Sequence, residues 1–201
     1  MPAKSARGSR GESRRRQIID GALAAIRVSS VADVQLAAIA EHAGMRANHV
    51  LYYFATRDEV LIAAAQQVEL TLADGRAESL AAVEDRDERL RAYVRTYLPE
   101  DRHDPIWKLW LEGWLRSASH EGFAAVGDVA YAGWLDDLVE TVQHAIDNGG
   151  SLSEPLRPFA RRMIFVLDGL AVHVMGGHIA HDEAVELALT TLRRELRLDA
   201  A

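Results

Sequence analysis

The sequence predicts an all-α protein, and three observations support this fold class. From residue 13 onward nearly every segment places apolar residues at helical spacing, whereas no segment has the alternation or the β-branched density of a strand. Helix-starting signals such as Asp104-Pro105 and helix-ending signals such as Asn148-Gly149 and Gly176-Gly177 recur between these stretches. The chain of 201 residues is long enough to bury a core without disulfides, and it contains no cysteine.

About nine helices follow from this periodicity. The predicted helices cover approximately residues 14–28, 34–43, 47–53, 56–73, 84–97, 104–115, 123–147, 155–175 and 182–197. We expect Asp33 to be the N-cap of the second helix, and Thr56 and Glu59 to form a capping box at the start of the fourth. Residues 1–11 are rich in Gly, Ser and Arg, which predicts a disordered basic arm.

Charge is distributed unevenly along the chain. The net charge is −7, yet residues 1–57 contain nine Lys and Arg against four Asp and Glu, which gives +5 and leaves −12 for the remainder. DNA would be attracted to the first part and repelled by the second. The basic N-terminus is not followed by an uninterrupted apolar run, and no window approaches the roughly 20 apolar residues of a membrane span. We therefore expect a cytoplasmic protein.

Residues 35–54 form the most informative segment. They read QLAAIAEHAGMRANHVLYYF, which predicts two short helices separated by a break at Gly44. Small Ala40 lets the helices approach closely, and this spacing is that of a helix-turn-helix. The apolar contacts that fix the crossing are expected from Ile39, Met45 and Val50.

An ordinary helical hairpin inside a core is the alternative interpretation of this segment. Polar Arg46, Asn48 and His49 on the outward face, together with the local positive charge, favour DNA binding over that alternative. Either Tyr52 or Tyr53 could instead pack against the first helix.

Residues 43–61, AGMRANHVLYYFATRDEVL, resemble the TetR family of one-component transcriptional repressors. The shared features are the Ala-Gly turn, the aromatic end of the recognition helix at residues 52–54, and the Thr-Arg-Asp-Glu start of the next helix. Residues 14–26 are similar to the first helix of that family, so the resemblance covers about residues 12–72. The C-terminal part is more weakly similar to the branch that includes repressors of choline and betaine genes.

The resemblance implies a homodimer whose subunits each have a three-helix head and a helical body. Residues 12–72 would be the DNA-binding domain and residues 73–201 the ligand-binding and dimerisation domain. The third helix would enter the major groove of double-stranded operator DNA. Residues at the positions where this family contacts DNA are Gln35, Arg46, Ala47, Asn48, His49, Tyr52, Tyr53 and Arg57. Ala37, Ala47 and Leu51 depart from residues common in the family, so the operator sequence should be this protein's own.

Three tryptophans, Trp107, Trp110 and Trp114, lie on one face of a predicted helix. Such a stripe can simply be core, or it can line an apolar cavity for a flat or cationic effector. The resemblance implies that these middle helices surround the inducer pocket. The effector-binding residues predicted on this basis are Trp107, Trp110, Leu111, Trp114, Trp134 and Phe165.

The last two predicted helices are apolar on more than one face, which indicates that a second subunit covers one of these faces. The predicted interface residues are Phe159, Val166, Leu170, His173, Val174, Leu189 and Leu192. Asp168 is expected either at this interface or as a polar group of the pocket. His173, His178 and His181 with Asp182 do not complete a four-ligand set, so we expect neither a metal nor a cofactor.

These observations predict a ligand-responsive DNA-binding transcriptional regulator, most simply a repressor that a small-molecule effector releases from its operator. The alternative is a helical DNA-binding or scaffold protein without an effector, in which the aromatic stripe is only core. The sequence has no GxSxG, P-loop, GxGxxG or HExxH motif, and we do not expect an enzyme.

Overall fold

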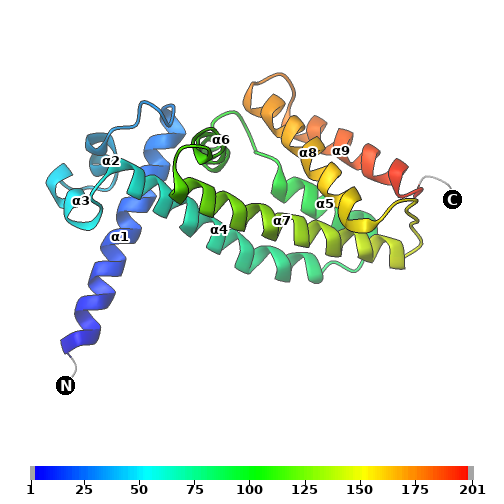
Figure 1. The fold of residues 1–201 in the computed structure, drawn as a ribbon, viewed down its shortest axis with the longest axis horizontal. Helices are drawn as coiled ribbons and strands as arrows, with labels where there is room; N and C mark the ends of the chain where they lie inside the picture. Colours follow the sequence, from blue (N-terminus) through cyan, green and yellow to red (C-terminus); the bar gives the residue numbers. More distant parts are fainter. Residues whose placement is uncertain (1–2, 199–201) are drawn as a thin grey trace. The chain divides into compact units, whose positions relative to one another are not determined.

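The computed structural model describes residues 3–198, and of residues 3–9 only the backbone. Within this range every regular element is an α-helix, which confirms the predicted fold class (Figure 1). The helices are α1 (Ala3–Val28), α2 (Leu36–His42), α3 (Ala47–Tyr53), α4 (Arg57–Ala81), α5 (Arg86–Tyr97), α6 (Pro105–Ser117), α7 (Glu121–Asp147), α8 (Leu156–Met175) and α9 (His181–Glu195). None of the described helices is long and apolar enough to cross a membrane.

The chain divides into two compact units. Unit 1 comprises Met1–Leu70 and Pro105–Gly127, and unit 2 comprises Thr71–Asp104 and Asp128–Ala201. The predicted boundary after residue 72 lies near the first division. However, α6 and the start of α7 belong to the N-terminal unit, which a linear partition of the sequence could not anticipate because they return to it after more than thirty intervening residues.

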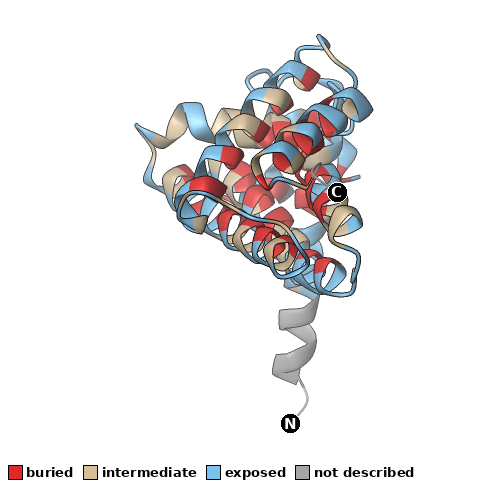
Figure 2. Ribbon diagram, turned by 90° about the vertical axis from the view of Figure 1, so that its right-hand side faces the viewer, coloured by how far each residue is buried: buried red, intermediate tan, exposed pale blue. Residues whose placement is uncertain are grey.

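The core of unit 1 is built from one face of each of its helices. Its buried members include Ile18, Ala22 and Ile26 of α1, Ile39 and Ala40 of α2, Val50 of α3 and Phe54 at its C-cap, Val60, Leu61 and Ala64 of α4, Leu109 of α6, and Phe123 and Val126 of α7. Figure 2 shows the same division along the helices, with buried residues on one side and exposed residues on the other. Burial of this shared apolar surface holds the short helices α2 and α3, which would be unstable alone.

Two glycines shape the helix-turn-helix. Gly44 has a φ of +64°, a left-handed backbone conformation that residues with a Cβ rarely adopt. It lies between α2 and α3 as predicted. Gly21 of α1 faces α2 so closely that a Cβ there would lie 2.8 Å from both the Ile39 carbonyl oxygen and the Ala43 Cβ. The backbones of α1 and α2 therefore approach each other because residue 21 has no side chain.

Several predicted helix ends are wrong. Helix α1 begins at Ala3 rather than at residue 14, so residues 3–11 of the predicted disordered arm are helical, while residues 1–2 lie outside the described range. The segment is rich in helix-forming Ala, Arg and Lys, which outweigh its two glycines. Helix α4 continues to Ala81 rather than residue 73, because Leu80 is still buried.

Two predicted caps also need correction. Asp33 is not the N-cap of α2: its carboxylate accepts a hydrogen bond from the Ser30 hydroxyl at 2.7 Å, and Gln35 occupies the cap position. At α4 the Thr56 hydroxyl accepts from the Glu59 amide at 3.1 Å, as a capping box requires. The Glu59 carboxylate, however, accepts from the amide of Ala55 at 2.9 Å, one residue before the expected partner.

Unit 2 packs α5, α8 and α9 with the end of α4 and most of α7. Its buried apolar residues include Leu90, Tyr93 and Val94 of α5, Leu138 and Val142 of α7, Phe159, Met163 and Leu167 of α8, and Val185, Leu189 and Leu192 of α9. Ion pairs on its surface join α5 to α9, among them Arg91 with Glu186 at 2.5 Å and Arg95 with Asp182 at 2.8 Å.

The structure corrects the predicted dimer-interface residues. Phe159, Val174, Leu189 and Leu192 are buried inside their own chain, so they cannot contact a second subunit. This part of the interface prediction is wrong because α8 and α9 are apolar on two faces. The four residues were taken from the face that packs into unit 2. Val166 and Leu170 are half-buried, and His173 is exposed.

We expect Asp168→Asn to raise the stability of unit 2 at neutral pH by roughly 1 kcal/mol. Burial raises the pKa of the Asp168 carboxyl above its ordinary 3.8, although the hydrogen bond from the Tyr97 hydroxyl, at 2.5 Å, acts in the opposite direction. A raised folded-state pKa means that stability falls as pH rises from the unfolded-state value through the folded-state one. Urea unfolding at pH 7 and at pH 3.5 checks this, because the advantage of Asn should vanish at the lower pH.

Candidate nucleic-acid interface

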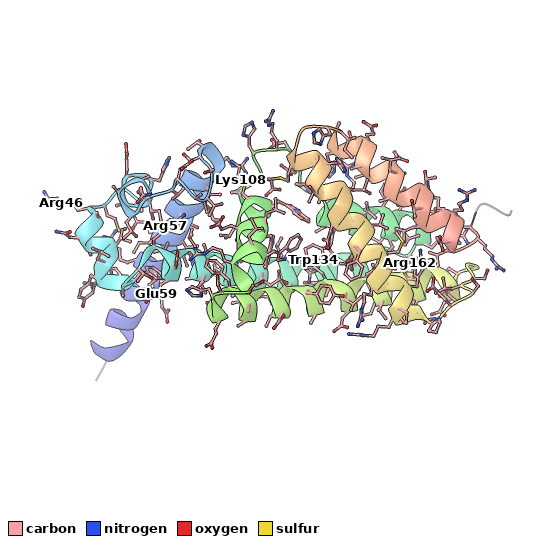
Figure 3. The ribbon with its side chains drawn as sticks, turned by 45° about the horizontal axis from the view of Figure 1, so that its top comes forward. Arg46, Arg57, Glu59, Lys108, Trp134 and Arg162 are labelled. Carbon is pink, nitrogen blue, oxygen red and sulfur yellow. The ribbon has the colours of Figure 1, made fainter. Side chains whose placement is uncertain are left out.

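Helix α3 turns its polar side away from the core of unit 1. Val50 is fully buried, whereas Asn48 and His49 are exposed and Tyr52 is 80% exposed. Arg46, at the N-cap position, is also exposed, and Figure 3 shows it at the periphery of unit 1. Four of the predicted DNA-contacting residues, Arg46, Asn48, His49 and Tyr52, therefore share one accessible surface.

A shallow hollow of about 710 Å³ lies along this surface. Its walls are formed by Arg14, Gly44, Met45, Arg46, Asn48, His49 and Tyr52. The two guanidinium groups make it electropositive, and the amide and imidazole provide groups that donate or accept at base edges. Arg14 of α1 thus joins the surface although the sequence did not predict it there.

Two side chains of α1 hold the ends of α2 and α3. The Gln17 amide donates to the Ala43 carbonyl at 2.6 Å, and the Arg15 guanidinium donates to the Tyr53 carbonyl at 2.7 Å. Arg15 also lies over the Phe54 ring, 4.1 Å from its centroid. These bonds satisfy carbonyls that the short helices leave without intrahelical partners. Apart from the basic start of the helix, no spacing signal in the sequence indicates them.

The two tyrosines have different roles. Tyr53 is half-buried, and its ring contacts those of His49 and Tyr52 at centroid distances of 5.5 and 5.1 Å. Tyr53 therefore orients its neighbours, while the exposed ring and hydroxyl of Tyr52 are available to a ligand. Ala47 is half-buried against the core, and Gln35 is exposed at the start of α2.

Arg57 does not take the predicted outward position. Its guanidinium donates to the Val34 carbonyl at 2.6 Å and to the Val31 carbonyl, and it lies 3.7 Å from the Asp58 carboxylate. It therefore ties the connection before α2 to the start of α4. A sequence motif does not reveal this because the accepting groups are backbone carbonyls.

Helix α6 is fastened to the same unit at both of its ends. Lys108 donates to the carbonyls of Ile26, Arg27 and Ser29 at 2.9–3.1 Å, which caps the C-terminus of α1. At the other end Arg116 makes two parallel hydrogen bonds to the Asp58 carboxylate, one of them at 2.8 Å. Hydrogen bonding to Arg116 holds the pKa of Asp58 below its usual 3.8, against the effect of burial.

We expect Asp58→Asn to destabilise unit 1 by about 1–2 kcal/mol at neutral pH, since it removes a charge-assisted pair that is only partly exposed. Because the folded-state pKa is lowered, this stabilisation exists above the unfolded-state pKa and is lost as pH falls through the folded-state value. Thermal unfolding of both proteins between pH 7 and pH 3 should show the difference shrinking with acidification. A difference that stays constant over this range would contradict the ion-pair explanation.

The residues predicted to bind an effector do not form one cluster within a unit. In unit 1, Trp107 and Trp114 meet edge to face at 5.8 Å, Trp110 packs against the core, and Leu111 is half-buried. In unit 2, Trp134 is buried and Phe165 is 58% exposed. The packing of Trp110 agrees with the core interpretation of the stripe for that residue.

The three histidines considered as metal ligands do not converge either. The Nδ1 atoms of His173 and His178 are 3.2 Å apart, while Nδ1 of His181 faces the Pro99 carbonyl oxygen at 2.9 Å. Among the described residues no group of three or more His, Asp or Glu side chains could hold a metal ion.

Comparison with known proteins identifies the family. Residues 86–197, more than half of the chain, match the C-terminal domain of the BetI-type transcriptional repressors. The chain belongs to this family. Membership in the BetI-type family confirms the TetR-like resemblance, and it agrees with the prediction that the protein is not an enzyme.

BetI-type relatives agree with this assignment, and solved structures share the fold. The HTH-type transcriptional regulator BetI 1 of Chromohalobacter salexigens is 33% identical over 103 residues, which are 50% of this chain and 51% of that protein. The chain spans about half the length of the curated relatives it matches. A Saccharomonospora viridis protein, described as a transcriptional regulator in complex with choline, has a TM-score of 0.80 at 23% identity and covers 91% of this chain and 96% of its own. A TetR transcription regulator of Haloarcula marismortui has a TM-score of 0.77 at 19% identity, covering 93% and 98%.

Proposed function

We propose that this BetI-type protein is a homodimeric, cytoplasmic repressor that binds operator DNA and leaves it when a small molecule binds. One observation carries the DNA-binding part of the proposal. Three polar side chains of α3, those of Asn48, His49 and Tyr52, are exposed and line one hollow together with Arg14 and Arg46. A helix that served only to pack would have no reason to gather these groups on its outer side.

Each group of this surface suits a different part of DNA. Asn48 and His49 can exchange hydrogen bonds with base edges in the major groove. Arg14 and Arg46 can neutralise phosphates, and the Tyr52 hydroxyl can donate to a phosphate oxygen. Phosphate contacts would position α3, and the base contacts would provide specificity.

The dimer proposal rests on an apolar face of unit 2 that the chain itself leaves exposed. Phe165 and Val172 of α8 are 58% and 47% exposed, Leu187 of α9 is 48% exposed, and Gly169 lies between the two α8 residues in sequence. A second copy that covers this face would bury large side chains, and a two-fold dimer would present two α3 helices to successive major grooves.

We expect Phe165→Glu together with Leu187→Glu to convert the dimer into a monomer and to weaken operator binding at least tenfold, because each subunit would then bind one half-site alone. Size-exclusion chromatography with light scattering measures the mass. The matched control is Val129→Glu, which places a charge on another exposed apolar residue of unit 2. A double variant that remains dimeric would place the interface elsewhere.

The effector part of the proposal is tested with choline, because the similar Saccharomonospora viridis protein holds choline. The purified protein is titrated onto a fluorescent duplex selected from a random library, and choline is added at constant ionic strength. We expect anisotropy to fall as choline lowers the affinity for DNA, since a ligand favouring one state shifts the population away from the other. Unchanged binding with choline and with other small cations would favour the effector-free alternative.

A further inference from the structure

The C-terminal end of α8 brings two histidines together. The chain leaves the helix at Gly176 and turns back at Gly177, whose φ is +71°, before the short connection to α9 (Figure 1). The His178 amide donates to the His173 carbonyl at 2.9 Å. The Gly177 amide donates to the Val174 carbonyl, also at 2.9 Å. These two bonds and the left-handed glycine define a Schellman motif.

Imidazoles occupy the two positions of this motif that commonly hold an apolar pair. In a Schellman motif the residue after the turn often packs an apolar side chain on the helical residue five positions earlier. Here these residues are His178 and His173, both exposed, and their ring centroids are 5.3 Å apart. Their Nδ1 atoms are 3.2 Å apart. The backbone of the helix end therefore holds two nitrogens that can bind a metal next to each other.

Gly176 allows the second ring to take this position. A Cβ at residue 176 would lie 2.9 Å from both Cε1 and Nδ1 of the His178 ring. Any side chain at residue 176 would therefore push this ring away from its present place. Because residue 176 has no side chain, Nδ1 of His178 stays close to Nδ1 of His173.

We propose that His173 and His178 form a two-histidine site for a divalent transition metal such as Zn²⁺, with water completing the coordination. Two nitrogens bound to one tetrahedral zinc ion at about 2.0–2.1 Å lie about 3.3–3.4 Å from each other. The observed separation of 3.2 Å therefore needs little adjustment. When the metal binds, each neutral ring carries its single proton on Nε2, so both Nδ1 lone pairs face the metal.

Solvent supplies the rest of the coordination shell. His181, in the same connection, directs its Nδ1 at the Pro99 carbonyl oxygen, 2.9 Å away. In the part of the chain that the structure describes, no three His, Asp or Glu side chains gather into a metal site. The exposure of both ligands leaves room for water. Imidazole suits Zn²⁺, Ni²⁺ and Cu²⁺, whereas Mg²⁺ and Ca²⁺ prefer oxygen ligands, so the site selects the transition metals.

The test is titration of ZnCl₂ into the tag-free full-length protein by isothermal calorimetry, with excess MgCl₂ in a buffer that does not bind metals. We expect His173→Leu and His178→Leu each to lower the Zn²⁺ affinity at least about tenfold, the least that disturbing the orientation of a ligand usually costs. Both variants should fold, because a leucine supplies the apolar contact common in this motif, and circular dichroism checks this. No DNA is present, so failure here is distinct from failure of the repressor proposal.

Two matched variants distinguish this site from ordinary surface histidines. His181→Asn removes an imidazole from the same connection but keeps a donor for the Pro99 carbonyl, so Zn²⁺ affinity should not change. Gly176→Ala keeps both imidazoles and displaces the His178 ring, so affinity should fall about tenfold. Cu²⁺ bound to the wild type should show coupling to two nitrogens by electron paramagnetic resonance. Wild-type affinity no greater than that of the two leucine variants, or an equal loss in His181→Asn, would overturn the proposal.

Discussion

Gly21→Val should destabilise unit 1 by about 3 kcal/mol, near the upper end of the usual cost of overpacking. A Cβ at this position would lie 2.8 Å from the Ile39 carbonyl oxygen and from the Ala43 backbone nitrogen, neither of which can move like a flexible side chain. Helices α1 and α2 would have to separate, which would displace α3 and its exposed side chains. Urea unfolding followed by circular dichroism measures the loss, and DNA binding measured on the same sample should weaken with it.

Gly11→Ala is the matched control on the same helix. A Cβ at Gly11 would have no heavy atom of another part of the chain within 4 Å, so the methyl group meets open space. Replacing a helical glycine by alanine should leave stability unchanged or raise it by up to about 1 kcal/mol. Equal destabilisation by both substitutions would show that glycine conformation, and not the approach of α1 to α2, explains the effect.

Arg46→Ala and Arg57→Ala should have opposite consequences, although the sequence predicts both residues at the DNA surface. Arg46 is exposed, so its removal should lower operator affinity by about 1–3 kcal/mol and leave the melting temperature unchanged. Arg57 bonds the carbonyls of buried Val31 and Val34, so its removal should cost about 1–3 kcal/mol of folding stability.

Both variants are compared by thermal unfolding and by fluorescence anisotropy on one duplex. If Arg57→Ala unfolded like the wild type and lost only DNA affinity, the structural role assigned to this side chain would be wrong. If Arg46→Ala bound DNA as the wild type does, Arg46 would not contact the operator.

Periodicity and local turn signals predict much of the head. The apolar spacing within residues 35–54 and the break at Gly44 are local properties, and Ile39, Ala40 and Val50 occupy the buried positions that this spacing requires. The exposure of Asn48, His49 and Tyr52 follows from the same helical period. These features depend on neighbours within a few residues and can therefore be predicted from one sequence.

Interactions between distant segments could not be predicted in this way. Gly21 looks like any helical glycine until α2 is placed against it, and Arg57 looks like a free cation until the carbonyls of Val31 and Val34 are in position. The Trp134 ring of α7 contacts Arg76 of α4 and Tyr93 and Tyr97 of α5, which are distant in sequence. For α8 and α9 both helix faces are apolar, so periodicity alone could not say which face enters the core of unit 2.

The central claim, that the exposed side chains of α3 read an operator, is tested most directly by selecting duplexes from a random library with the full-length protein. Wild type should enrich two inverted half-sites whose centres are separated by about 10–10.5 base pairs or a multiple of this spacing. Asn48→Ala with His49→Ala should lose the base preference at fixed positions of each half-site while retaining salt-dependent, non-specific binding. A wild-type selection without any enriched sequence, or a double variant that enriches the same sequence as wild type, would contradict the claim.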